Sequence, residues 1–190
     1  MEALIFLGFI ALIFLYVVVS AYKGRKQWQD IARGLGATCK GRGALQGTYN
    51  GCSFSTKLRR RQKRLGKTQI CIPTSGLPEG LSISRSYNGE DVLAIFKKKQ
   101  QDIEVGIPEL DEPLQIKGKD PEQISKLFAA LQQPELILQI CLSESYSFIT
   151  EDTIQIEIHL WPPTLQGIQK ALDLLVGCRT DLQAAAKAIK

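Results

Sequence analysis

The stretch that decides the fold reads Ala44-Leu-Gln-Gly-Thr-Tyr-Asn-Gly-Cys-Ser-Phe-Ser-Thr-Lys-Leu58, two strand-like runs separated by Asn50-Gly51. Asn and Gly together tolerate the positive φ angles that a two-residue hairpin turn requires. We therefore predict an antiparallel hairpin formed by residues 44–49 and 52–58.

The same pattern continues along the chain. Residues 67–73 are predicted to form a third strand, and residues 114–117 a short one. Residues 81–87 and 91–96 flank a second Asn-Gly pair, and residues 146–150 and 154–161 flank Glu151-Asp152. In the last run, isoleucines alternate with polar residues, which is typical of a strand with one buried face.

Two helices are predicted to cover the strands. Asp120-Pro121 combines a capping acceptor with a proline at the first helical position, and apolar residues follow at helical spacing. Pro134 either ends this helix or begins another turn. Pro162-Pro163-Thr164 opens a long C-terminal helix. The predicted fold class is α+β, one domain of antiparallel β-hairpins packed on two helices and preceded by a transmembrane helix.

The predicted transmembrane anchor spans residues 1–22. Residues 3–22 are twenty consecutive uncharged residues, long enough as a helix to cross the roughly 30 Å of a bilayer's hydrocarbon core. A cleaved signal peptide, with Val19-Ser20-Ala21 near the cleavage position, and a buried core helix are the alternatives. The expectation is a single-pass membrane protein.

Charges next to the anchor predict its orientation. Glu2 precedes it, whereas Lys23, Arg25 and Lys26 follow it, so the N-terminus is expected outside and the soluble domain in the cytoplasm. Residues 23–36 are predicted to form a juxtamembrane amphipathic helix, and residues 37–190 the soluble domain. Trp28 is expected either at the lipid interface or in the core.

Charge is unevenly distributed along the chain. Residues 23–70 hold 13 Lys or Arg and one acid, whereas residues 71–190 hold 11 Lys or Arg and 17 acids. The densest basic run, residues 57–67, has seven cations and no acid. Contact with anionic lipid, nucleic-acid binding and a solvated loop are three interpretations, and nucleic acid is disfavoured because residues 57–67 contain no aromatic side chain for base stacking. The candidate lipid-facing residues are Trp28, Lys57, Arg59, Arg60, Arg61, Lys63, Arg64 and Lys67.

No motif predicts catalysis, a metal site or a cofactor. The five cysteines include no C-x-x-C pair and are expected to be reduced thiols. His159, the only histidine, is expected to be an exposed strand residue rather than a general base. Asp111, with Glu109 and Glu112, lies in a loop bracketed by prolines, where acidic residues are common for structural reasons.

Residues 105–121, Val-Gly-Ile-Pro-Glu-Leu-Asp-Glu-Pro-Leu-Gln-Ile-Lys-Gly-Lys-Asp-Pro, resemble a stretch in a family of uncharacterised bacterial single-pass membrane proteins. That family also has an N-terminal anchor, a Trp-bearing helix and a Gly-x-Tyr-x-Gly hairpin like Gly47-Thr-Tyr49-Asn-Gly51. Ile107 and Leu110 depart from its pattern of Asp and Phe. The resemblance implies a membrane-anchored α+β domain and no known activity, so it assigns no functional residue.

The expected function is a non-catalytic binding or scaffold domain, anchored in the membrane on its cytoplasmic face, with a basic loop contacting anionic lipid and an unidentified protein as partner. The alternative is a membrane-bound hydrolase or transferase that uses the Asp111 loop.

Overall fold

The computed structural model of the chain describes residues 2–41, 44–59, 66–86, 102–144, 146–159 and 164–190. In the first helix it describes the side chains of residues 12–16, 18–20 and 22 onward. Eight strands of this part form one antiparallel sheet in the order β1-β2-β3-β4-β8-β7-β5-β6. The strands are β1 (Thr38–Cys39), β2 (Leu45–Tyr49), β3 (Cys52–Arg59), β4 (Lys67–Pro73), β5 (Ser82–Arg85), β6 (Leu114–Lys117), β7 (Phe148–Thr150) and β8 (Thr153–Ile158).

The first predicted hairpin is confirmed. β2 and β3 pair with Tyr49 opposite Cys52, so Asn50 and Gly51 form the two-residue turn. Their φ angles are 47° and 78°, the left-handed region that this turn type needs and that Asn and Gly adopt at low cost.

The order of the remaining strands was not predictable from neighbouring runs. β4 pairs on one side with β3 and on the other with β8, from the far end of the chain. β7 and β8 form the predicted hairpin about Glu151-Asp152. Of the hairpin predicted about Asn88-Gly89, the first strand contains β5, whereas the turn and the second strand lie in residues 87–101, outside the described part. β5 pairs with β6 on one side and β7 on the other.

The helices are α1 (Glu2–Gly34), α2 (Pro108–Asp111), α3 (Pro121–Ala129), α4 (Glu135–Cys141) and α5 (Leu165–Ala188). The predicted N-cap is confirmed: the Asp120 side chain accepts from the Gln123 N–H at 3.1 Å. The C-terminal helix is capped in the same way by Thr164, whose Oγ1 accepts from the Gly167 N–H at 3.1 Å. Pro134 separates two helices, α3 and α4.

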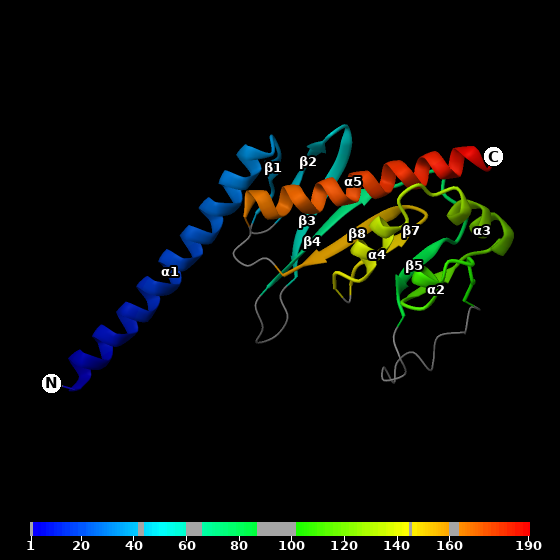
Figure 1. Cartoon of the computed structure of the whole chain (residues 1–190). Helices are drawn as coiled ribbons and strands as arrows, with labels where there is room; N and C mark the ends of the chain where they lie inside the picture. Colours follow the sequence, from blue (N-terminus) through cyan, green and yellow to red (C-terminus); the bar gives the residue numbers. More distant parts are fainter. Residues whose placement is uncertain (1, 42–43, 60–65, 87–101, 145, 160–163) are drawn as a thin grey trace.

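The domain has two layers. α5 lies across one face of the sheet, contacting β4 and β8, and α4 packs between α5 and the strands β5, β7 and β8 (Figure 1). Alternate strand residues supply the core beneath these helices, including Ile70, Ile72, Ile154 and Ile156. Leu172 and Leu175 of α5 are fully buried in the same cluster.

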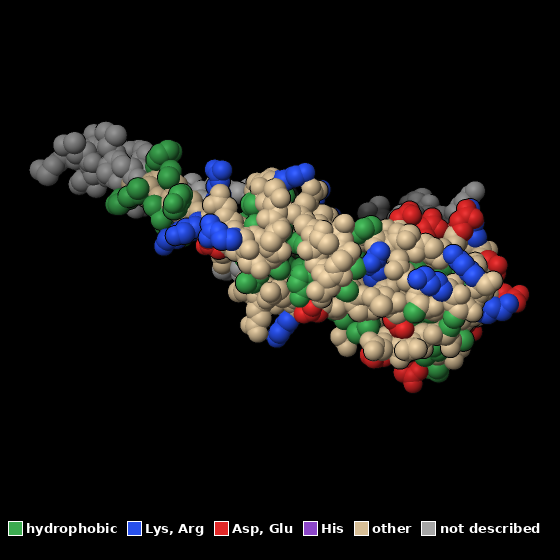
Figure 2. All heavy atoms as spheres, turned by 90° about the horizontal axis from the view of Figure 1, so that it is seen from above, with side chains coloured by type: hydrophobic (Ala, Val, Ile, Leu, Met, Phe, Trp, Pro, Cys, Tyr) green, Lys and Arg blue, Asp and Glu red, His purple; other side chains and the backbone are tan. Residues whose placement is uncertain are grey.

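α1 is one continuous helix that joins the predicted anchor and juxtamembrane segments without a break. Its last turns belong to the domain core, because Trp28, Ile31 and Ala32 are buried there. The rest extends away from the sheet (Figure 1). Apolar side chains on the extending part are exposed, as the hydrophobic side chains beside the basic ones show in Figure 2; these are Leu12, Ile13, Phe14, Leu15, Tyr16, Val18, Val19 and Tyr22.

The predicted membrane placement is contradicted. Within the described residues, no helix combines the length and the apolar character needed to cross a bilayer. This finding overturns the transmembrane helix in the predicted fold class, the single-pass description, and the localisation with the N-terminus outside and the domain in the cytoplasm. The α+β part of the prediction, an antiparallel sheet packed on helices, is what the structure contains.

Candidate functional site

The face of the sheet opposite α5 is lined by polar side chains. Along β3, Cys52, Phe54 and Thr56 are buried, whereas Ser53 and Lys57 between and beyond them are exposed. The same alternation places Gln69 and Cys71 of β4, opposite Lys57 and Ser55, on this outward side. We call this surface the open face.

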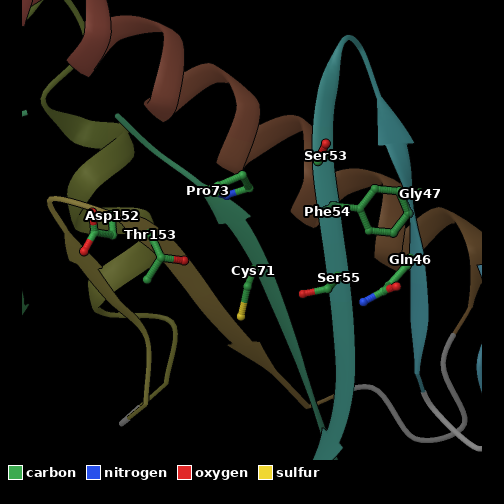
Figure 3. A pocket seen from close by; sticks show the side chains of 9 residues that line it. All are labelled: Gln46, Gly47, Ser53, Phe54, Ser55, Cys71, Pro73, Asp152 and Thr153. Carbon is green, nitrogen blue, oxygen red and sulfur yellow. The ribbon is translucent and has the colours of Figure 1, made fainter. Parts of the chain in front are cut away.

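A hollow of about 480 Å³ lies on the open face over β2, β3, β4 and the start of β8. Figure 3 shows the side chains that line it, with α5 behind the sheet. The lining is mixed: Gln46, Ser53, Ser55, Cys71 and Thr153 contribute amide, hydroxyl and thiol groups, Asp152 a carboxylate, and Gly47, Phe54 and Pro73 apolar surface. Its volume is in the range of ligand-binding clefts, roughly 300–1,000 Å³.

The Cys71 thiol in this hollow donates to Gln155 Oε1 at 3.2 Å. Burial raises the pKa of Cys71, and the nearby ammonium of Lys57 lowers it by less. The thiol is therefore neutral at physiological pH, and its role in the hollow is that of a weak hydrogen-bond donor.

Beyond the hollow, the open face ends in a group of cations on β3 and β4. Arg59 and Lys67 stand directly opposite each other in the antiparallel register, and Lys57 lies two residues before Arg59 on the same side of β3. We call Lys57, Arg59 and Lys67 the cationic end. Like charges on opposed strand positions destabilise a sheet unless anions compensate them.

Two glutamates compensate Lys67. Its Nζ lies 2.6 Å from Glu144 Oε2 and 3.2 Å from Glu157 Oε2. Burial acts to lower the pKa of Lys67, but hydrogen bonds to both carboxylates outweigh this and raise the pKa above its ordinary value. Lys67 is therefore a fixed cation, with its side chain only 16% exposed.

Glu157 is fully buried, at 0% exposure. Its backbone N–H donates to Ser147 Oγ at 2.8 Å, while its Oε1 has no hydrogen-bond partner in the described part of the chain. Burying a carboxylate is costly in free energy unless a cation lies close to it. The burial of Glu157 is therefore stabilised by its contact with Lys67.

The predicted lipid-facing residues have different environments. Trp28 is 1% exposed, so it is a core residue and does not face lipid. Lys57 is exposed, Lys67 is ion-paired, and the Arg59 guanidinium lies 3.7 Å from the centroid of the Tyr146 ring. Four of them, Arg60, Arg61, Lys63 and Arg64, lie outside the described residues.

Asp111, the residue on which the alternative hydrolase or transferase depended, has a structural role. Its two carboxylate oxygens accept from the backbone N–H groups of Val105, Gly106 and Ile107 at 2.9–3.1 Å. Asp111 ends α2 and precedes β6, whereas His159 follows β8, which is three positions from β6 in the sheet. Among the described residues, no group of His, Cys, Asp and Glu side chains could hold a metal ion.

Sequence reasoning missed Glu144. Its Oε1 lies 2.6 Å from Nε2 of His159, which is 58% exposed as expected, and its Oε2 contacts Lys67. Glu144 is 77 residues from Lys67 in the chain, and no local pattern links the two. One signal could have indicated it. Residues 23–70 contain a single acid, so the counter-charges of the basic run had to come from later in the chain.

No family model, curated protein or solved structure matches the chain. The resemblance of residues 105–121 to uncharacterised bacterial membrane proteins thus stays a prediction. The site must be interpreted from its own geometry.

Proposed function

We propose that this protein is a non-catalytic binding domain that recognises an acidic polypeptide segment on the open face, at its cationic end. The observation that carries the proposal is that β3 places Ser53 and Ser55 of the hollow on the same side of the sheet as Lys57 and Arg59. Hydroxyl and amide groups in the hollow suit the peptide groups of an extended segment, and the cations suit its carboxylates.

Three observations favour a polypeptide over other anions. The lipid interpretation drew its support from an anchor holding the basic run near a bilayer, and that support is gone with the anchor. In the described part of the cationic end, Tyr146 does not present its ring for base stacking on the side where Arg59 covers it. The hollow is a recess in the sheet rather than a projecting tip, which suits an inserted chain.

A binding function also fits the use that the domain makes of its carboxylates. Asp111 and Asp120 cap backbone N–H groups, and Asp181 accepts from two more. Asp173 accepts from the Tyr49 hydroxyl at 2.8 Å. Side chains engaged in this way hold the fold together and are not poised for proton transfer.

The proposal is tested with fluorescently labelled polyglutamate, titrated with the full chain and followed by anisotropy. We expect saturable binding that weakens as salt rises, because the contact is electrostatic. Lys57→Glu should weaken it by about five- to tenfold. Lys117→Glu is the matched control, since Lys117 lies on β6 at the opposite edge of the sheet.

Absence of polyglutamate binding at low salt would overturn the proposal, as would equal weakening by the two substitutions. The same titration with an oligonucleotide, and sedimentation with phosphatidylcholine vesicles with and without phosphatidylserine, provide the competing outcomes. Binding to either of these without binding to polyglutamate would replace the polypeptide with that partner.

A further inference from the structure

Glu144 occupies the cationic end in the manner of a ligand. Both oxygens of its carboxylate are engaged at 2.6 Å, one with Lys67 Nζ and the other with His159 Nε2. These are the short contacts of charge-assisted hydrogen bonds, and a carboxylate from another molecule would be held by the same two groups.

The segment that carries Glu144 is strapped over three strands. The Tyr146 carbonyl accepts from Gln155 Nε2 at 2.7 Å, and Ser147 Oγ accepts from the Glu157 N–H at 2.8 Å. The Tyr146 ring lies beneath Arg59. We call Glu144, Tyr146 and Ser147 the acidic strap. Its carboxylate pairs with Lys67 of the cationic end, while Arg59 stacks on its Tyr146 ring.

Of the two carboxylates that contact Lys67, we take Glu144 to be the exchangeable one. Glu157 is fully buried and belongs to an interior strand, β8, where its carboxylate lies 3.2 Å from Lys67 Nζ. Glu144 is 21% exposed and lies in a connection between α4 and β7. Once Glu144 leaves, Glu157 still compensates Lys67, while Arg59 and His159 are available to a new carboxylate.

We propose that Lys67, His159 and Arg59 form an oxyanion-binding site whose internal occupant is Glu144, and that a carboxylate of the acidic partner displaces it. This inference rests on the proposed function, because it concerns the same cationic end. It makes the strap an autoinhibitory contact: the partner binds only the fraction of molecules in which Glu144 is displaced, and its apparent affinity falls by that fraction.

The test compares polyglutamate affinity between Glu144→Gln and the wild-type full chain. We expect Glu144→Gln to bind about tenfold more tightly, as the competing carboxylate is gone. Glu122→Gln removes the same charge from an exposed pair with Lys126 on α3 and is the matched control. Adding Arg59→Ala to Glu144→Gln should reverse the gain. Inorganic phosphate, titrated by thermal shift, reports whether the emptied site takes a small oxyanion alone.

Equal affinities of Glu144→Gln and Glu122→Gln, with the wild type still binding, would overturn this inference and leave the proposed function intact. Absence of binding by both the wild type and Glu144→Gln would overturn both. Tighter binding by Glu144→Gln than by both the wild type and Glu122→Gln supports the strap as a mask. If Glu144→Gln fails to fold, Glu144→Asp shortens the reach while keeping the charge, and wild-type affinity in that variant counts against displacement.

Discussion

At the scale of single residues, the role of each carboxylate depends on the donor or cation that it contacts. Asp111, Glu144 and Glu157 each look like generic acids in the sequence, yet they have three different roles. Asp111 gathers backbone N–H groups, Glu157 is a buried counter-ion, and Glu144 is a partly exposed one. The partners of Asp111 lie within six residues of it, in agreement with the structural role expected of acids in that loop. The ion pairs of Glu144 and Glu157 with Lys67 span 77 and 90 residues, so no local pattern in the sequence indicated them.

Asp111→Ala is expected to destabilise the domain by about 1–3 kcal/mol, the cost of leaving buried or half-buried donors without an acceptor. Three N–H groups lose their partner at once, and Leu110 beside them is fully buried. Urea unfolding followed by circular dichroism measures the loss. Glu109→Ala, at an exposed neighbouring position, should leave the midpoint unchanged; a similar loss in both variants would contradict the capping role.

At the scale of elements, local signals predicted well what depends on adjacent residues. The Asn50-Gly51 turn, the Asp120 cap and the β7–β8 hairpin all follow from side-chain chemistry within a few positions. The pairing of β4 with β8 and the two-residue strand β1 do not, because partners distant in the chain are chosen by packing of the whole sheet.

Asp181 couples two elements. Its carboxylate on α5 accepts from the backbone N–H groups of Gln132 and Gln133, which connect α3 to α4. We expect Asp181→Ala to cost about 0.5–1.5 kcal/mol of unfolding free energy, because water can replace the carboxylate at these exposed N–H groups. We also expect faster hydrogen exchange in α3 and α4 than in β3 and β4, because the substitution loosens the joint rather than the sheet. Uniform exchange across the domain would contradict this.

At the scale of the whole molecule, the largest error concerned the N-terminus. An uncharged run of twenty residues predicted an anchor that ends at residue 22, whereas α1 is one helix from Glu2 to Gly34 whose last turns pack into the domain. Trp28 had two interpretations, and burial favours the core. The hydropathy of residues 3–22 does not indicate how far their helix extends. Because α1 continues to Gly34, Trp28 lies in a turn that packs into the domain core.

Two buried thiols make the stability of the whole domain depend on pH in the alkaline range. Burial raises the pKa of Cys141 to about 12 and also raises that of Cys178. Each thiol holds its proton more tightly when folded, so its contribution to stability is complete below the unfolded pKa of about 9 and is lost as pH rises above it. Unfolding free energy should fall between about pH 9 and 11, and Cys141→Ala should reduce the slope. An unchanged slope in that variant would contradict the assignment.

The position of β4 has a consequence for the nascent chain. β4 is an interior strand, yet its second neighbour is β8, whose Ile158 stands opposite Thr68. As synthesis proceeds, β2, β3 and β4 can assemble early as a meander. The backbone N–H and C=O groups on one edge of β4 then stay unpaired until Ile158, ninety residues after its partner Thr68, has left the ribosome. The pairing of β4 with β8 is therefore a late event, and the ion pairs of Lys67 with its two glutamates form in that final step.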